Sequence, residues 1–481
     1  MKNKRIKIAT LSLVCLSTLS LATSCGGDSG KEKLTIIALE ASYGVTWIEE
    51  LEKEFEKLHP EIDVDVTTSY SAGSLIDSHL NSSNNPDDLY ISVGSNWKTN
   101  AAEGYFASLD DLLEDTVDGI TVKEKVSDEY KNSIYYTNSD GTKSCYRLPW
   151  TAGIGGIYYN AKMFRDNEWD EWLKTTYPGN TSGTPETFEQ LSALCDKINS
   201  DQVPVPNNEI NAVKPFAYTG ANSDYFDYLV FNWWSQIAGV DAIHEFLKYE
   251  SALNYDATQN ETYAALKTAT SYWAQIFTNK NNVIEGSESK TASNAQKEFF
   301  TGAAAMMVNG DWLYNDSLPF AKNGVLDLRL MKTPSLPESK NTNSAYVIGE
   351  DQFIAIPESS KKKDLAKEFI KLMISDKGCE IFLEKGHGFL AYKADYSKFE
   401  IAQNDAYLKS AIEIRDSYEY KYTNFSNNRK YLCNYIDIWC TGAQRPYIHL
   451  INGTSPSVDA SFSSIAYLAQ QNWELWTNQS K

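Results

Sequence analysis

Near the start of the chain the spacing of apolar residues changes twice within a short distance, and this change constrains the fold more than any other feature. Residues 34–39 form a continuous apolar run, which is typical of a strand covered on both faces. Apolar residues then recur every three or four positions from Thr46 to His59, which predicts an amphipathic helix, with Thr46 and Glu49 spaced as a capping box. Alternation over residues 62–66 predicts a second strand. A β-α-β unit of this kind predicts an α/β fold, and the length of 481 residues predicts two domains.

The N-terminal segment has the pattern of an export signal. Four basic residues are followed by about 15 uncharged residues and then by Leu-Ala-Thr-Ser-Cys at 21–25. The uncharged run is too short for a comfortable membrane span. The motif resembles the bacterial lipobox, which implies a signal peptide at 1–24, acylation of Cys25 and a lipidated tether at 25–33. The alternative is an ordinary signal with a chance cysteine.

The exported chain is acidic. Loss of the four basic residues of segment 1–24 changes the formal charge of −20 to −24, so we expect no nucleic acid and no anionic ligand as a partner. Solubility alone explains the acidity equally well. Five cysteines remain without a CxxC spacing, which predicts neither a zinc site nor a disulfide framework. Only Cys433 and Cys440 are close enough in sequence to suggest a bridge, and the sequence leaves that pairing open.

The stretch 293–312 combines structural and functional signals. It predicts a short helix carrying Phe299 and Phe300, a glycine turn, a buried strand and a polar tip ending in Trp312. A strand in an open α/β sheet delivers the residues after its carboxyl end to a crevice, so we expect Asp311 and Trp312 at the mouth of a ligand cleft. The alternative is that Trp312 packs a loop onto the core, since tryptophan is highly buried on average.

The same stretch carries a family resemblance. A phenylalanine, then Gly-x-Ala-Ala-Met at 302–306, then Gly-x-Trp at 310–312 resembles the signature of the extracellular solute-binding proteins of carbohydrate ABC importers, a group that includes the maltodextrin-binding proteins. In that family the tryptophan of the motif stacks on a sugar ring. Other loose motifs follow in the family's order, so that the resemblance spans residues 34–476. The aromatic content of 13% suits a sugar binder, because pyranose rings present apolar C–H faces to aromatic rings.

The resemblance implies a two-lobe α/β architecture of the periplasmic-binding-protein type, with a ligand cleft between lobes that are joined by three hinge crossings. Lobe one is expected at 34–150 together with 343–392. Lobe two is expected at 151–342 together with 393–481.

The expected ligand contacts come partly from the resemblance and partly from the carboxyl-edge rule for open sheets. Tyr43 follows the first strand, although an unremarkable surface turn explains it as well. Family members often carry charged residues at the positions of Ser95 and Asn96, so the type of contact there is open. The expected residues are Trp312 and Tyr225 for stacking, Asp311, Ser95 and Asn96 for sugar hydroxyls, and Tyr43, Trp150 and Glu350 as cleft walls, with packing as the alternative for Trp150.

The predicted function is the carbohydrate-binding component of an ABC importer. It captures a sugar by lobe closure, delivers it to permease subunits, acts as a lipid-anchored monomer on the extracytoplasmic side of the cell membrane, and needs neither cofactor nor metal. No HExxH, G-x-S-x-G, Walker A, dinucleotide or EF-hand pattern occurs. Carboxylates are plentiful, so the alternative is a secreted glycan-degrading enzyme that uses a carboxylate pair. A surface adhesion module is a third interpretation.

Overall fold

The computed structural model describes residues 30–40, 42–206, 208–321, 324–349, 352–423, 450, 453 and 455–478. Several predictions fall outside these described residues. They are the signal peptide, acylation at Cys25, most of the tether, the wall residue Glu350, and the pair Cys433 and Cys440.

The first large sheet has the order β16-β3-β1-β2. Strands β1 (Glu32–Leu39), β2 (Ile62–Ser69) and β3 (Leu89–Ser92) are parallel, and β16 (Phe353–Ala355) is antiparallel to β3. The β-α-β prediction is therefore confirmed. Strand β1 begins two residues before the expected start of lobe one, because Glu32 and Lys33 pair with residues 62 and 63 of β2.

Helix α1 (Thr46–Leu58) connects β1 to β2 and covers the sheet with the apolar face that the sequence pattern predicts. Helices α13 (Lys363–Ile374) and α14 (Asp376–Gly386) pack against α1. The predicted capping box is wrong. The helix begins at Thr46 itself and Val45 is the N-cap, so no side chain caps the first turn.

The second large sheet has the order β12-β13-β9-β14. Strands β12 (Lys214–Ala217) and β13 (Ala304–Asn309) are parallel, and β9 (Gly156–Asn160) runs antiparallel to both β13 and β14 (Leu328–Leu330). All of β13 is buried, and Gly302 turns before it with a φ of 84°. The predicted turn and buried strand of the 293–312 stretch are confirmed.

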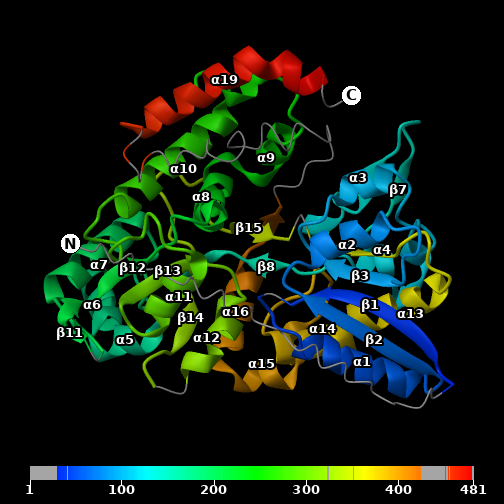
Figure 1. Cartoon of the computed structure of the whole chain (residues 1–481). Coiled ribbons are helices and arrows are strands. Elements are labelled where there is room, and N and C mark those ends of the chain that lie inside the picture. The colour runs from blue at the N-terminus through cyan, green and yellow to red at the C-terminus, as the bar shows by residue number, and fades with distance from the viewer. Residues whose placement is uncertain are drawn as a thin grey trace, which may run out of the picture.

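A small third sheet, β17-β15-β8, lies between the two large ones (Figure 1). Its strands are β8 (Gly153–Ile154), β15 (Ser344–Ile348) and β17 (Tyr420–Tyr422). Strand β8 leads into β9 of the second sheet, whereas β15 leads towards β16 of the first. A third segment runs beside them, since Ala152 N–H donates to Phe389 O at 2.8 Å and Ala391 N–H donates to Trp150 O at 3.0 Å. Three segments thus pass side by side between two α/β lobes, as predicted.

The second lobe is largely helical outside its sheet. Helix α19 (Val458–Asn478), the red helix in Figure 1, packs on α10 (Glu261–Phe277) and on η4 (Ala252–Tyr255). No helix among the described residues is long and apolar enough to cross a membrane. The remaining elements are α2 (Ala72–Leu80), α3 (Trp97–Ala102), η1 (Leu112–Glu114), β4 (Thr116–Val117), β5 (Ile120–Thr121), α4 (Val122–Lys125), η2 (Asp128–Tyr130), β6 (Tyr135–Thr137), β7 (Lys143–Cys145), α5 (Ala161–Asp166), α6 (Trp169–Thr176), α7 (Phe188–Asp201), β10 (Pro204–Val205), β11 (Asn208–Ala212), η3 (Ser223–Phe226), α8 (Asp227–Ala238), α9 (Val240–Phe246), η4 (Ala252–Tyr255), α10 (Glu261–Phe277), α11 (Ala292–Phe300), α12 (Leu313–Ala321), η5 (Tyr396–Lys398), α15 (Glu400–Asn404), α16 (Ala406–Ser417) and α19 (Val458–Asn478).

Candidate functional site

Two strand ends, one from each large sheet, meet where the lobes touch. Tyr43 lies in the turn after β1, and Asp311 follows β13. The Tyr43 hydroxyl donates a hydrogen bond of 2.7 Å to Asp311 Oδ1, and both residues are buried. Asn315 Nδ2 also donates to Ser42 O at 3.1 Å. Ser42 has a φ of 64°, a left-handed conformation that is uncommon for a residue other than glycine, so the turn that carries Tyr43 is sharply bent.

Asp311 occupies an apolar and crowded position. Gly153 of β8 lies against it, since a Cβ atom built at Gly153 would be 3.1 Å from Asp311 Oδ1. Asp311 Oδ2 has no hydrogen-bond partner among the described residues. Burial raises the pKa of the Asp311 carboxyl to about 7, against the opposing effect of the hydrogen bond from Tyr43. Asp311 therefore holds a proton far more readily than an exposed aspartate does.

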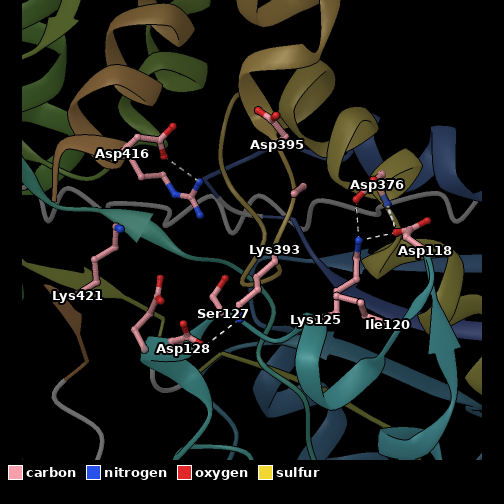
Figure 2. A pocket seen from close by; sticks show the side chains of 13 residues that line it. Asp118, Ile120, Lys125, Ser127, Asp128, Asp376, Lys393, Asp395, Asp416 and Lys421 are labelled. Atoms are coloured by element: carbon pink, nitrogen blue, oxygen red, sulfur yellow. Dashed lines mark hydrogen bonds and ion pairs between the residues drawn. The ribbon is translucent and has the colours of Figure 1, made fainter. Parts of the chain in front are cut away.

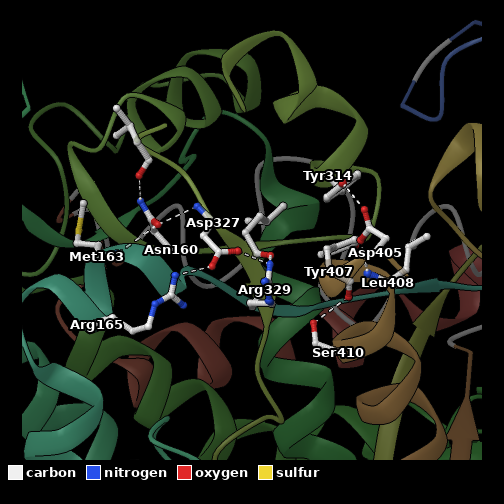
Figure 3. Close-up of polar contacts among 12 residues, drawn as sticks. Asn160, Met163, Arg165, Tyr314, Asp327, Arg329, Asp405, Tyr407, Leu408 and Ser410 are labelled. Atoms are coloured by element: carbon white, nitrogen blue, oxygen red, sulfur yellow. Dashed lines mark hydrogen bonds and ion pairs between the residues drawn. The ribbon is translucent and has the colours of Figure 1, made fainter. Parts of the chain in front are cut away.

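Helix α16 supports this loop from the second lobe. The Tyr407 hydroxyl donates to the backbone oxygen of Asp311 at 3.1 Å. Tyr314 stacks on Tyr407 with ring centroids 4.3 Å apart, and its hydroxyl donates to Asp405 at 2.7 Å (Figure 3). These contacts fix the backbone that carries Asp311.

Trp312 is surrounded by tyrosine rings that stand nearly perpendicular to its indole plane. The ring of Tyr43 from the first lobe lies 6.4 Å away at 90°. Tyr225 and Tyr228 from the second lobe lie at 6.5 and 5.5 Å, at 84° and 79°. Trp312 is 8% exposed and Asp311 is 1% exposed. Both side chains are thus covered in this structure instead of lying open at a cleft mouth, because tyrosines of both lobes close over them.

Trp150 lies behind Tyr43 in the core of the first lobe. It is fully buried, with ring centroids 5.4 Å from Trp47, 6.3 Å from Phe382 and 6.2 Å from Tyr43. The packing alternative describes Trp150 in this structure. Its position supports the ring of Tyr43 from behind.

Ser95 and Asn96 follow β3 at the same carboxyl edge, but the structure separates their roles. The Ser95 hydroxyl donates to Asp77 Oδ1 at 2.6 Å, and Asn100 Nδ2 donates to the same oxygen at 2.8 Å. Asn96 is exposed, and its side chain makes no hydrogen bond within the described part of the chain. No hydrogen bond or ring contact between described residues links Ser95 or Asn96 to Trp312.

The sequence analysis did not select two aromatic residues: Tyr228, which lies beside Trp312, and Tyr70, which lies at the carboxyl edge of the first sheet. Tyr228 is three residues after Tyr225, a spacing that puts both on one side of a helical turn. Tyr70 directly follows β2 at the carboxyl edge beside the end of β1, and it is 75% exposed. The carboxyl-edge rule, applied to β2 as it was to β1, would have selected Tyr70.

A cavity near the lobe boundary is lined mainly by charged residues (Figure 2). It has a volume of about 490 Å³, and none of the expected ligand contacts within the described residues lines it. Two of its lysines are paired with carboxylates: Lys125 with Asp118 and Asp376, and Lys393 with Asp128 at 3.0 Å. The third, Lys421, donates to Tyr418 O at 2.7 Å. The ion pairs of Lys125 and Lys393 satisfy those charges, which favours a structural role for these two lysines. Across the described ranges no three His, Cys, Asp or Glu side chains converge as a metal site requires.

The model of the family described as "Bacterial extracellular solute-binding protein" matches residues 38–378. The chain belongs to this family. The match extends from β1 through the second lobe to α14, so it includes both strand ends that meet at Tyr43 and Asp311.

Two curated relatives within the solute-binding family match most of the chain. The Multiple sugar-binding protein of Streptococcus mutans is 22% identical over 387 residues, which cover 79% of this chain and 80% of the relative. The Diacetylchitobiose binding protein DasA of Streptomyces coelicolor is 25% identical over 406 residues, which cover 81% and 82%.

Solved structures share the fold at low identity. RafE from Streptococcus pneumoniae, in its apo form, has a TM-score of 0.62 at 16% identity and covers 95% of this chain and 99% of its own. The GacH receptor of Streptomyces glaucescens has a TM-score of 0.63 at 15% identity, with 92% and 98% covered. The predicted two-lobe α/β fold class is confirmed.

Proposed function

We propose that this solute-binding protein captures a sugar or oligosaccharide between its lobes and delivers it to the permease of an ABC importer. The observation that carries the proposal is the meeting of Tyr43 from one lobe with Asp311 and Trp312 from the other. Aromatic faces suit the apolar C–H faces of pyranose rings, and a carboxyl beside them suits the hydroxyls. The two curated relatives, whose names state that they bind sugars, support the same ligand class.

Lobe closure supplies the binding mechanism. A ligand that contacts both lobes stabilises the closed form through interactions that are absent when the lobes part. A micromolar affinity, about −8 kcal/mol, requires only a few stacked rings and hydrogen bonds after the cost of closure. No bond in the sugar needs to change.

We assign the lobes as 34–150 with 343–392, and 151–342 with 393–481. The packing of α13 and α14 on α1 supports the return of the chain to the first lobe after β15. Between the lobes, β8 and β15 serve as hinge segments, since they pair with each other through Val347 and Ile154.

We assign direct ligand contacts to Trp312 and Tyr225 as stacking rings and to Asp311 and Asn96 as hydroxyl partners. Ser95 donates its proton to Asp77 and accepts a hydrogen bond from Asn100 Nδ2 at 3.0 Å, so its role towards a sugar is to accept through the remaining lone pair of its hydroxyl oxygen. Tyr43 forms the wall opposite Trp312. Trp150 is assigned as the support behind that wall. Glu350, which lies outside the described residues, is assigned as a further wall residue.

The proposed setting is the outer face of the cell membrane. Residues 1–24 direct export, Cys25 carries the acyl chains, and the following residues tether the lobes at the surface. Each buried methylene contributes about 0.8 kcal/mol, so more than one chain holds the protein stably. The monomer then meets the permease subunits by diffusion along the membrane.

A thermal-shift screen against raffinose, diacetylchitobiose, maltotriose and xylotriose tests the proposal. A sugar that binds only the folded protein raises Tm, and calorimetry on the best one measures the affinity. Chromatography of the same mixtures after prolonged incubation separates binding from cleavage. We expect a raised Tm and intact sugar. Shortened products would support the glycan-degrading alternative, and no Tm change across a broad sugar panel would contradict carbohydrate capture.

A further inference from the structure

The indole ring of Trp312 lies directly on Gly310. A Cβ atom built on Gly310 would be 2.3 Å from Cη2 and Cζ3 of Trp312 and 2.7 Å from Cε3. Carbon atoms that are not bonded to each other prefer a separation of about 3.5–4 Å. Any side chain at position 310 would therefore force the ring or the backbone to move by about 1 Å or more.

The backbone at Gly310 is held on both sides, so it cannot easily yield. Its N–H donates to Asn309 Oδ1 at 2.8 Å, and Asn309 is fully buried at the end of β13. Its carbonyl oxygen accepts a hydrogen bond from Leu313 N–H at 3.1 Å. The indole is also enclosed from the outside, since Tyr43, Tyr225 and Tyr228 approach it edge to face. A ring displaced from Gly310 would have to push these tyrosines aside.

We propose that Gly310 is a positioning residue that sets the plane of the Trp312 indole, and through it the geometry with which the cleft receives a pyranose ring. The claim about how the cleft receives a pyranose ring rests on the proposed sugar-binding function. The claim about the indole plane concerns the ring alone. It gives the Gly-x-Trp motif a physical reason: the glycine is the support on which the tryptophan folds back, and the residue between them is the buried Asp311.

A ligand-free experiment tests the ring position by itself. Near-ultraviolet circular dichroism of Gly310→Ala is compared with that of the unchanged protein, and the same substitution is made on a Trp312→Phe background, which lacks the benzo ring that the Cβ would meet. Gly179→Ala is the matched control, since a Cβ built at Gly179 meets no atom within 4 Å. We expect an altered aromatic signal for Gly310→Ala alone, and little change for Gly179→Ala or on the Trp312→Phe background.

The second experiment measures sugar binding. It uses whichever of raffinose, diacetylchitobiose, maltotriose and xylotriose raises Tm most. Gly310→Ala is expected to weaken its binding at least tenfold, but less than threefold when Phe stands at 312, because the substitution then has no ring to displace. An equal loss on both backgrounds would overturn the proposal, and so would an unchanged aromatic signal in Gly310→Ala.

Folding failure and ligand failure are both informative. If Gly310→Ala does not fold, the double variant with Trp312→Phe is expected to fold, since the clash is relieved; its failure to fold would overturn the proposal. If no sugar binds the unchanged protein, the proposed function fails, while the spectra still decide whether Gly310 positions the ring.

Discussion

Tyr43 and Asp311 are 268 positions apart in the chain, and the Tyr43 hydroxyl donates to the Asp311 carboxylate at 2.7 Å inside a buried contact between the lobes. Each belongs to the turn after a strand of a different sheet. The contact therefore joins the carboxyl edges of the two lobes. It also places a buried carboxyl, with one oxygen unpartnered among the described residues, beside the rings of Tyr43 and Trp312.

Removing the hydroxyl should weaken this contact. Tyr43→Phe keeps the ring that packs on Phe382 at 5.1 Å but leaves the buried carboxyl without its donor. We expect a loss of about 1–3 kcal/mol in the free energy of unfolding, measured by urea denaturation. Tyr467→Phe is the control, since that ring is 64% exposed. Equal stability of the two variants would show that the hydrogen bond contributes little.

The Asp311 carboxyl should make stability depend on pH. Its pKa is raised to about 7 by burial, so the folded state holds the proton where the unfolded state has lost it. The stabilisation is present below the ordinary pKa of 3.8 and is lost as pH rises through about 7. The titratable groups that interact with the Asp311 carboxyl are the charged Arg415 and the hydroxyls of three tyrosines, Tyr43, Tyr158 and Tyr407.

Asp311→Asn removes this titration. Relative to the variant, the unchanged protein should lose on the order of 4 kcal/mol in the free energy of unfolding between pH 4 and pH 8, at about 1.4 kcal/mol for each pKa unit. Asp316, whose pKa burial raises to about 6, titrates in both proteins and cancels in the difference. Urea denaturation of both proteins across this pH range measures the difference in the free energy of unfolding. A difference that stays constant with pH would contradict the burial of a protonated carboxyl.

Trp312 should matter for binding beyond its contribution to packing. Trp312→Ala is expected to weaken sugar binding at least tenfold, about 1.4 kcal/mol, and to lower stability by about 3–5 kcal/mol, because the ring is buried. Trp169→Ala is a control for the packing effect. Trp169 is fully buried in the second lobe, where it donates to Asp201 at 2.8 Å. Calorimetric titration below the Tm of both variants should find weaker binding in Trp312→Ala only.

Tyr70 should act as an exposed stacking ring of the first lobe. Tyr70→Ala is expected to weaken sugar binding about three- to tenfold while leaving Tm within a degree or two, since surface substitutions usually change stability by about 0.5 kcal/mol or less. Tyr467→Ala, on the outer face of α19, is the matched control. If both variants bind as the unchanged protein does, Tyr70 is not part of the site.

Local patterns predicted the elements of this fold well. The apolar run of β1, the helical spacing of α1 and the small-residue run of β13 each report how one element is buried. The capping box at Thr46 failed because a cap depends on which residue starts the helix, and element boundaries are the part of a sequence pattern that is least determined.

The candidate site was less predictable because it depends on pairs of distant residues. A serine at position 95 does not indicate that its hydroxyl will donate to Asp77. In the same way, Trp150 looks the same in sequence whether it lines a cleft or supports Tyr43. Likewise, the hydrogen bond from Tyr43 to Asp311 follows only from how two sheets are placed relative to each other.

A crystal structure of the protein with the best-binding sugar tests the central claim most directly. We expect an intact sugar between the lobes, with one of its rings within about 4 Å of the Trp312 indole. A sugar bound on the outer surface of either lobe, or a cleaved product in the cleft, would contradict the account.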